Sequence, residues 1–126
     1  MTRQEVTEYI FDAYSVEPDF PFPRDGVSCV FRHPENRKWF ALSMSVPRGT
    51  LGLRRDGNVD ILNVKCDPLL MGAFRGKPGF LPAYHMNKDK WITVLLDGSA
   101  GREDIEALLA MSHRMTAPKI RKRGTP

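Results

Sequence analysis

The sequence predicts an α+β fold in which an antiparallel sheet has helices packed on one face. Three observations indicate this fold. An amphipathic helical pattern lies at each end of the chain, short β-branched and aromatic runs fill residues 27–66, and a further helix and strand follow them. The expected order of elements is α-β-β-β-β-α-β-α. The chain has 126 residues, the length of one domain, and we assign residues 1–118 to that domain.

The first helix is predicted from the segment "TRQEVTEYIFDAYSV". Thr2 is followed three residues later by Glu5, which is the pattern of a capping box at a helix start. The three prolines of "EPDFPFP" cannot continue the helix and predict an extended connector. The face that we expect to be buried contains the apolar residues at spacings of three and four, which are Val6, Tyr9, Ile10 and Ala13.

Four strands are predicted between residues 27 and 66. The runs "VSCVFRH" and "KWFALSMSV" are separated by the turn "PENR" and are rich in residues that favour strands. Two further runs, "TLGLRR" and "NVDILNVK", meet at Asp56-Gly57-Asn58, a strong hairpin signal because these residues tolerate positive φ. This hairpin supplies the third and fourth strands.

The rest of the chain predicts a helix, a strand and a last helix. Asp67 and Pro68 are a helix N-cap and first-turn proline, and Gly76 ends that short helix. "KPGFLP" is expected to be a loop, and "KWITVLL" a strand that ends at the turn "DGS". The segment "REDIEALLAMSHRM" is amphipathic, and Pro118 follows it. Its inward face is expected to contain Ile105, Leu108, Leu109 and Ser112.

The net charge of +4 lies in the last eight residues. These contain four basic residues and no acid, and removing the four from the 19 basic residues leaves as many bases as the 15 acids. We assign residues 119–126 to a basic tail that attracts phosphates without regard to sequence. The alternative is a solubilising end with no partner. The basic residues of this tail are Lys119, Arg121, Lys122 and Arg123.

The segments "VKCDP", "GFLPAYHMNKDKWITVLLDG" and "RKWFALSMSV", together with a last helix that contains Ser112, resemble the MmcQ/YjbR family of small bacterial proteins. The most specific part is "YHMNK", followed closely by Trp91. The resemblance covers nearly the whole chain and implies a CyaY-like α+β fold with a proposed double-wing arrangement for binding DNA. The sequence departs from the family at Ala83, where glycine is frequent, and at His113, where tyrosine is expected.

The segment around "YHMNK" is the first candidate binding surface. Nucleic-acid binding needs positive groups for phosphates and flat side chains on which bases rest. Tyr84, His85, Lys88 and Lys90 supply both within seven residues. The alternative is that the segment wraps the end of a strand, with Tyr84 covering the sheet and His85 fixing loop backbone.

The predicted hairpin is the second candidate, because Arg48, Arg54 and Arg55 lie in it. A basic hairpin can act as a wing that lies on the phosphate backbone. The alternative is an edge strand whose charges prevent aggregation.

Other classes of function have weaker support. The sequence contains no nucleophile elbow, Walker loop, dinucleotide fingerprint or zinc-protease motif, so we expect no enzyme activity and no cofactor. Glu5, Glu8 and Asp12 share one helix face, but exposed carboxylates there are usually only the solvated side, so we assign no metal site.

We therefore expect a non-enzymatic, DNA-binding protein that uses a basic strand-hairpin surface. A protein-interaction module that docks through "GFLPAYHM", and a small-ligand or metal-binding domain, remain alternatives. No apolar run reaches the length of a membrane helix and no signal peptide is recognised, so we expect no membrane partner and a cytoplasmic location. We expect Cys29 and Cys66 to be reduced thiols, which agrees with a cytoplasmic location.

Overall fold

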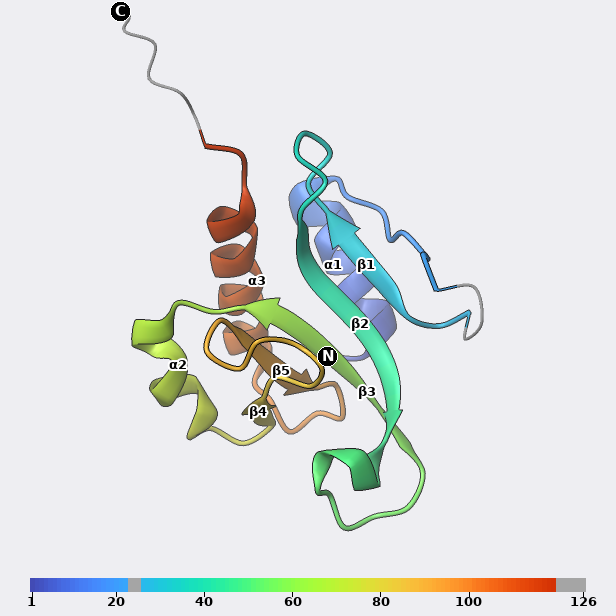
Figure 1. The fold of residues 1–126 in the computed structure, drawn as a ribbon. Helices are drawn as coiled ribbons and strands as arrows, with labels where there is room; N and C mark the ends of the chain where they lie inside the picture. The colour runs from blue at the N-terminus through green and yellow to red at the C-terminus, as the bar shows by residue number, and fades with distance from the viewer. Residues whose placement is uncertain (23–25, 120–126) are drawn as a thin grey trace, which may run out of the picture.

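The computed structural model describes residues 1–22 and 26–119. Within them the chain forms one antiparallel sheet of five strands in the order β1-β2-β3-β5-β4, with helices on one face (Figure 1). The predicted α+β class is confirmed. The elements are α1 (Arg3–Tyr14), β1 (Cys29–Arg32), β2 (Trp39–Pro47), the 3₁₀ turn η1 (Arg48–Leu51), β3 (Asn58–Lys65), α2 (Pro68–Arg75), β4 (Phe80–Pro82), β5 (Trp91–Leu95) and α3 (Arg102–Thr116).

The predicted order of elements is corrected in two segments. Residues 50–55 do not form a strand but belong to the connection between β2 and β3, because Gly52 takes a positive φ of 75° that breaks an extended run. Residues 80–82, predicted as loop, form β4. This strand lies at the edge of the sheet, where proline is tolerated because the N–H group that it lacks is not needed to pair with a further strand.

Both predicted helix starts are confirmed. The Thr2 hydroxyl accepts a hydrogen bond from the Glu5 amide at 3.1 Å, and the Glu5 carboxylate accepts one from the Thr2 amide at 2.8 Å. The Asp67 carboxylate accepts from the Leu69 amide at 2.9 Å. These caps fix the residues at which α1 and α2 begin.

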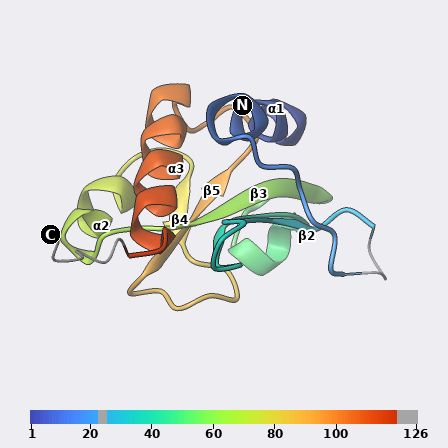
Figure 2. The ribbon, with the colours of Figure 1, turned by 90° about the horizontal axis from the view of Figure 1, so that it is seen from above.

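The main core lies between the sheet and the helices α1 and α3, which Figure 2 shows on the same side of the sheet. Of the face predicted for α1, Val6 and Ile10 are buried, whereas Ala13 is exposed. The predicted inward face of α3 is confirmed in full. The strand residues that meet these helices include Phe31, Phe40, Leu62, Val64, Ile92 and Val94.

Ser112 joins α3 to two strands. The register between β1 and β2 shifts beside Arg32, and this irregularity lets both Phe40 and Ala41 pack in the helix-side core. The Ser112 hydroxyl donates to the Phe40 carbonyl at 2.5 Å and accepts from the Lys65 amide at 2.8 Å. Ser112 is fully buried, so no solvent can replace either bond.

Two histidines pack together at the end of α3. The rings of His33 and His113 lie 4.2 Å apart between centroids, and His113 also stacks on Tyr14 at 4.3 Å. The His33 imidazole shares a 2.9 Å hydrogen bond with the Thr116 hydroxyl. Burial and the neighbouring His33 lower the pKa of His113, and Glu35 opposes this weakly.

The lowered pKa of His113 predicts a loss of stability on mild acidification. Because the folded pKa of His113 lies below its ordinary value of 6.5, the unfolded chain takes up the proton first, and the free energy of unfolding should fall as the pH drops below about 6.5. Urea unfolding between about pH 7.5 and 5.5 measures this, a range above the titration of ordinary carboxylates. His113→Phe should flatten the pH dependence, and an unchanged slope in that variant would contradict the assignment.

Candidate nucleic-acid interface

The face of the sheet opposite α1 and α3 is covered by two loops. Residues 48–57 connect β2 to β3, and residues 83–90 connect β4 to β5. Both lie on the same side of the sheet in Figure 2. Their apolar residues share one cluster, in which Leu51, Leu53 and Tyr84 pack against strand residues Val46, Val59, Ile61 and Leu95. The two predicted candidate surfaces therefore lie on one face of the molecule.

The 48–57 loop is closed from inside by Arg48. Its guanidinium donates to the carbonyls of Asp56 at 3.3 Å and Asn58 at 2.9 Å, and its amide donates to the Gly57 carbonyl. Arg48 thus ties the two ends of the loop together, a structural role that the sequence prediction did not assign. Arg54 and Arg55 are exposed in the same loop.

The 83–90 loop is fixed by a buried polar pair in the sheet. Asn63 on β3 lies opposite Thr93 on β5, and both are fully buried. The Thr93 hydroxyl donates to the Asn63 side-chain oxygen and accepts from the Tyr84 amide at 2.8 Å. The Asn63 side chain donates to the Tyr84 carbonyl at 3.0 Å. Both backbone groups of Tyr84 are therefore held by the sheet.

Tyr84 and His85 form a stacked pair of rings. Their centroids are 4.0 Å apart and their planes differ by 10°. His85 has a φ of 58°, a left-handed conformation that costs a residue other than glycine about 1–2 kcal/mol. The stack is thus held in a conformation that the isolated loop would rarely adopt.

A tight turn follows the rings and sets the direction of Lys88. Asn87 accepts hydrogen bonds from the amides of Asp89, Lys90 and Trp91, the first through its side chain at 2.9 Å. Arg75 on α2 donates to the Lys88 carbonyl at 2.7 Å. These contacts fix the loop backbone while the Lys88 side chain stays exposed.

A hollow of about 540 Å³ separates the two loops. Thr50 and Leu51 line it from one loop, and Tyr84, His85 and Lys88 line it from the other. The structure thus combines a cation, two flat rings and a hydroxyl around one open space, which is the chemistry that a phosphate and a base require.

A second hollow of about 520 Å³ lies beside the arginines, lined by Arg48, Arg54 and Arg55 together with Asp97. Burial tends to raise the pKa of Asp97, but hydrogen bonds from the Ser99 hydroxyl and amide outweigh it and lower the pKa below its usual range. Asp97 therefore carries a negative charge at neutral pH among the arginines and repels a phosphate placed there.

The remaining predicted residues lie elsewhere. Lys90 is exposed just before β5 and does not line the hollow between the loops. Lys119 follows α3 in the sequence, and the last turn of α3 lies at the opposite end of the molecule from the 48–57 loop in Figure 1. Arg121, Lys122 and Arg123 lie outside the described residues.

Sequence reasoning missed four residues of this site: Thr50, Leu51, Asn63 and Thr93. The available signal was Asn63, which lies between Leu62 and Val64 in the strand pattern "NVDILNVK" and alternates onto the same face as Val59 and Ile61, since a buried polar residue must find partners. Its partner Thr93 is 30 residues away in the sequence, and no local pattern connects the two.

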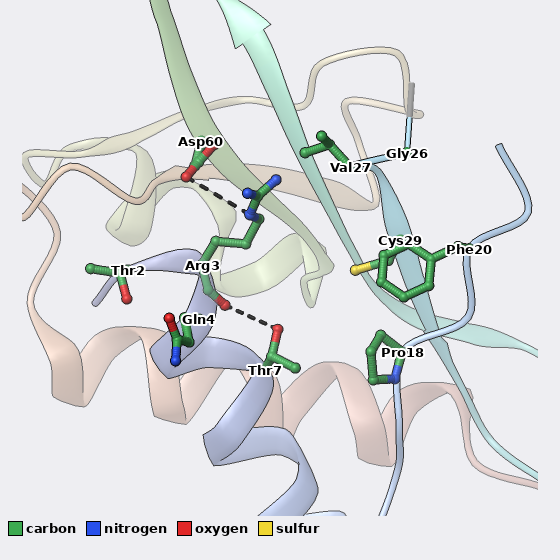
Figure 3. Close-up of a pocket in the computed structure, with 10 residues that line it drawn as sticks. All are labelled: Thr2, Arg3, Gln4, Thr7, Pro18, Phe20, Gly26, Val27, Cys29 and Asp60. Atoms are coloured by element: carbon green, nitrogen blue, oxygen red, sulfur yellow. Dashed lines mark hydrogen bonds and ion pairs between the residues drawn. The ribbon is translucent and has the colours of Figure 1, made fainter. Parts of the chain in front are cut away.

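A third hollow, of about 490 Å³, lies at the start of α1 (Figure 3). Arg3, Phe20 and Cys29 line it, and none of the predicted site residues does. The Arg3 Nε atom is 3.9 Å from the Asp60 carboxylate, and its buried Nη1 atom has no hydrogen-bond partner among the described residues.

Three further features complete the description of the side chains and helices. Among residues 1–22 and 26–119, no three His, Cys, Asp or Glu side chains group closely enough to hold a metal ion. Over the same residues, no helix has the length and apolar character needed to span a bilayer. The thiols of Cys29 and Cys66 are both buried.

Comparisons with known proteins place the chain among small proteins of similar fold. The sequence model of the YjbR family matches residues 11–115. The uncharacterized protein YyaQ of Bacillus subtilis (strain 168) is 34% identical over 116 residues, which cover 92% of this chain and 98% of that protein.

Three solved structures have a fold similar to that of this chain. A crystal structure of a Pseudomonas syringae protein is 43% identical with a TM-score of 0.90, and covers 93% of this chain and 100% of its own. A solution NMR structure from Pseudomonas syringae is 40% identical with a TM-score of 0.88, and covers 98% and 99%. The Deinococcus radiodurans protein DR2400 is more distant, at 25% identity and a TM-score of 0.68 over 94% and 80%.

Proposed function

The chain belongs to the YjbR family, and from this premise we propose that it is a non-enzymatic protein that binds DNA across the 48–57 and 83–90 loops. The observation that supports this most is the placement of Arg54, Arg55 and Lys88 on two loops that pack on one face of the sheet. Lys88 lines the hollow that contains the stacked rings, and the two arginines line the second hollow. The cations would hold phosphates and the rings would contact bases.

The two loops fit a double-wing arrangement in this proposal. Each projects from the same face of the sheet and each is anchored by its own apolar residues. Arg48 and the pair Asn63–Thr93 keep the loops in shape, so their charges need little reorganisation on binding. We place the protein in the cytoplasm as part of this proposal.

One observation favours a second candidate, a protein contact on α2. Leu69 is 91% exposed and its neighbour Leu70 is 42% exposed. Two adjacent leucines in contact with water are unfavourable, and a protein partner that covered them would remove this apolar surface from water. Such a contact would change little with salt, whereas binding of DNA weakens steeply as salt rises.

The experiment that tests the proposal is fluorescence anisotropy with labelled oligonucleotides across a salt series. It compares the full chain with a chain that ends at Pro118, which lacks all four basic residues of the tail. We expect salt-sensitive binding that survives the truncation, because the proposed site is on the folded body. Binding that disappears with the tail would overturn the proposal.

Asp97 provides a prediction of increased binding. Asp97→Asn keeps a side-chain oxygen for the bonds from Ser99 but removes the negative charge beside the arginines. Affinity for DNA at low salt should rise about threefold, the effect of one favourable charge interaction of about 0.5–1 kcal/mol. The same anisotropy titration measures it, with Asp12→Asn as the control, because Asp12 is an exposed carboxylate on α1, which packs on the other face of the sheet. Weaker binding of DNA by Asp97→Asn would contradict the placement of phosphates at Arg54 and Arg55.

A further inference from the structure

The ring pair Tyr84–His85 differs in exposure between its two members. Tyr84 is half-buried in the apolar cluster, whereas His85 is exposed, and both line the hollow between the loops. Two parallel rings 4.0 Å apart present a flat surface on which a third flat ring can continue the stack. A nucleobase is the flat ring that a nucleic-acid partner supplies.

Contacts within the protein hold the Tyr84–His85 stack in place without a ligand. The buried pair Asn63–Thr93 holds the amide and carbonyl of Tyr84, and His85 is kept in its left-handed conformation. A platform that is already ordered loses little conformational entropy on binding.

The opposite wall of the hollow completes a site for one base. Leu51 offers an apolar surface, and the Thr50 hydroxyl, which donates to the Pro47 carbonyl at 2.6 Å, keeps acceptor capacity for a base N–H group. Lys88 at the rim can hold the adjoining phosphate. The volume of about 540 Å³ lies in the range of about 300–1,000 Å³ that is usual for ligand sites.

Only an unpaired base can use such a site, because neighbouring pairs cover both faces of each base inside a duplex. We infer that the hollow between Thr50–Leu51 and Tyr84–His85 takes one unpaired nucleobase, so that the protein prefers single-stranded to duplex nucleic acid. This inference rests on the proposed function and specifies the form of its ligand.

The test removes the exposed ring and, separately, the bases. His85→Asn removes the imidazole but keeps a residue type that tolerates positive φ, so the loop should fold as before. Anisotropy titrations use a labelled single strand of thymidines, a hairpin duplex with the same number of phosphates, and an abasic strand of the same length. Phe11→Gln is the control variant, because it removes an exposed ring from α1, which packs on the other face of the sheet. The urea midpoint of each variant checks its folding.

The inference expects the thymidine strand to bind at least about tenfold more tightly than the duplex or the abasic strand. His85→Asn should weaken thymidine binding about five- to hundredfold and change duplex binding less than about twofold, while Phe11→Gln changes neither appreciably. Equal, salt-sensitive binding of all three ligands would overturn the inference but leave the proposed function standing. Failure to bind any of them would overturn both.

Discussion

Replacing Arg54, Arg55 and Lys88 together by glutamine is expected to weaken binding to single-stranded DNA about fiftyfold at about 0.15 M salt. Each phosphate contact on a single strand contributes about 0.7 to the slope of log K against log salt, so the slope should become shallower by about two units. The three side chains are exposed, so the fold should be unaffected. Anisotropy titrations at four or five salt concentrations measure both quantities.

A matched variant separates local contacts from net charge. Arg37→Asn, Lys38→Gln and Arg114→Gln remove the same three charges from the turn between β1 and β2 and from the last turn of α3, which lie away from both loops in Figure 1. This variant should lose less than about threefold in affinity, since distant charges are screened at this salt concentration. An equal loss in both variants would mean that overall charge, not the loop surface, drives binding.

Ser112→Ala is expected to lower the free energy of unfolding by about 2–4 kcal/mol. The substitution removes one hydroxyl but leaves two backbone groups, the buried Phe40 carbonyl and the partly buried Lys65 amide, without the partner that Ser112 provides. Leaving each such group unsatisfied costs about 1–3 kcal/mol. Urea unfolding followed by circular dichroism measures the change.

Ser43→Ala is the matched control for that variant. Ser43 is also fully buried in the sheet, but its hydroxyl has no hydrogen-bond partner among the described residues. The same serine-to-alanine change should therefore leave stability unchanged or raise it by about 1 kcal/mol. Equal losses in the two variants would contradict the role given to the Ser112 bridge.

The sequence predicted most of the fold because its signals are local. The capping box at Thr2, the N-cap at Asp67 and the periodicity of α3 each depend on residues within a few turns of one another. β4 was missed because it has only three residues, contains a proline, and is defined by pairing with β5 rather than by its own pattern. The strand predicted over residues 50–55 has suitable leucines, but these pack on the sheet as part of a loop.

The candidate site could be predicted only in part, for a related reason. Tyr84, His85 and Lys88 were visible as residue types, but the hollow that they share with Thr50 requires two loops about 35 residues apart to fold onto one face. Arg48 has the same charge as Arg54, and only the structure shows that its guanidinium is used inside the loop. Lys88 and Lys90 are likewise two residues apart in the sequence, but both lie in the turn that Asn87 begins, and only Lys88 lines the hollow.

The most direct test of the account is to follow backbone amide chemical shifts by NMR while a short DNA single strand is added to the ¹⁵N-labelled protein. The proposed interface predicts that the largest changes fall in residues 48–57 and 83–90, and that α1 and the first turns of α3 change little. Shifts confined to residues near the C-terminus, or spread over the helix-covered face, would contradict it.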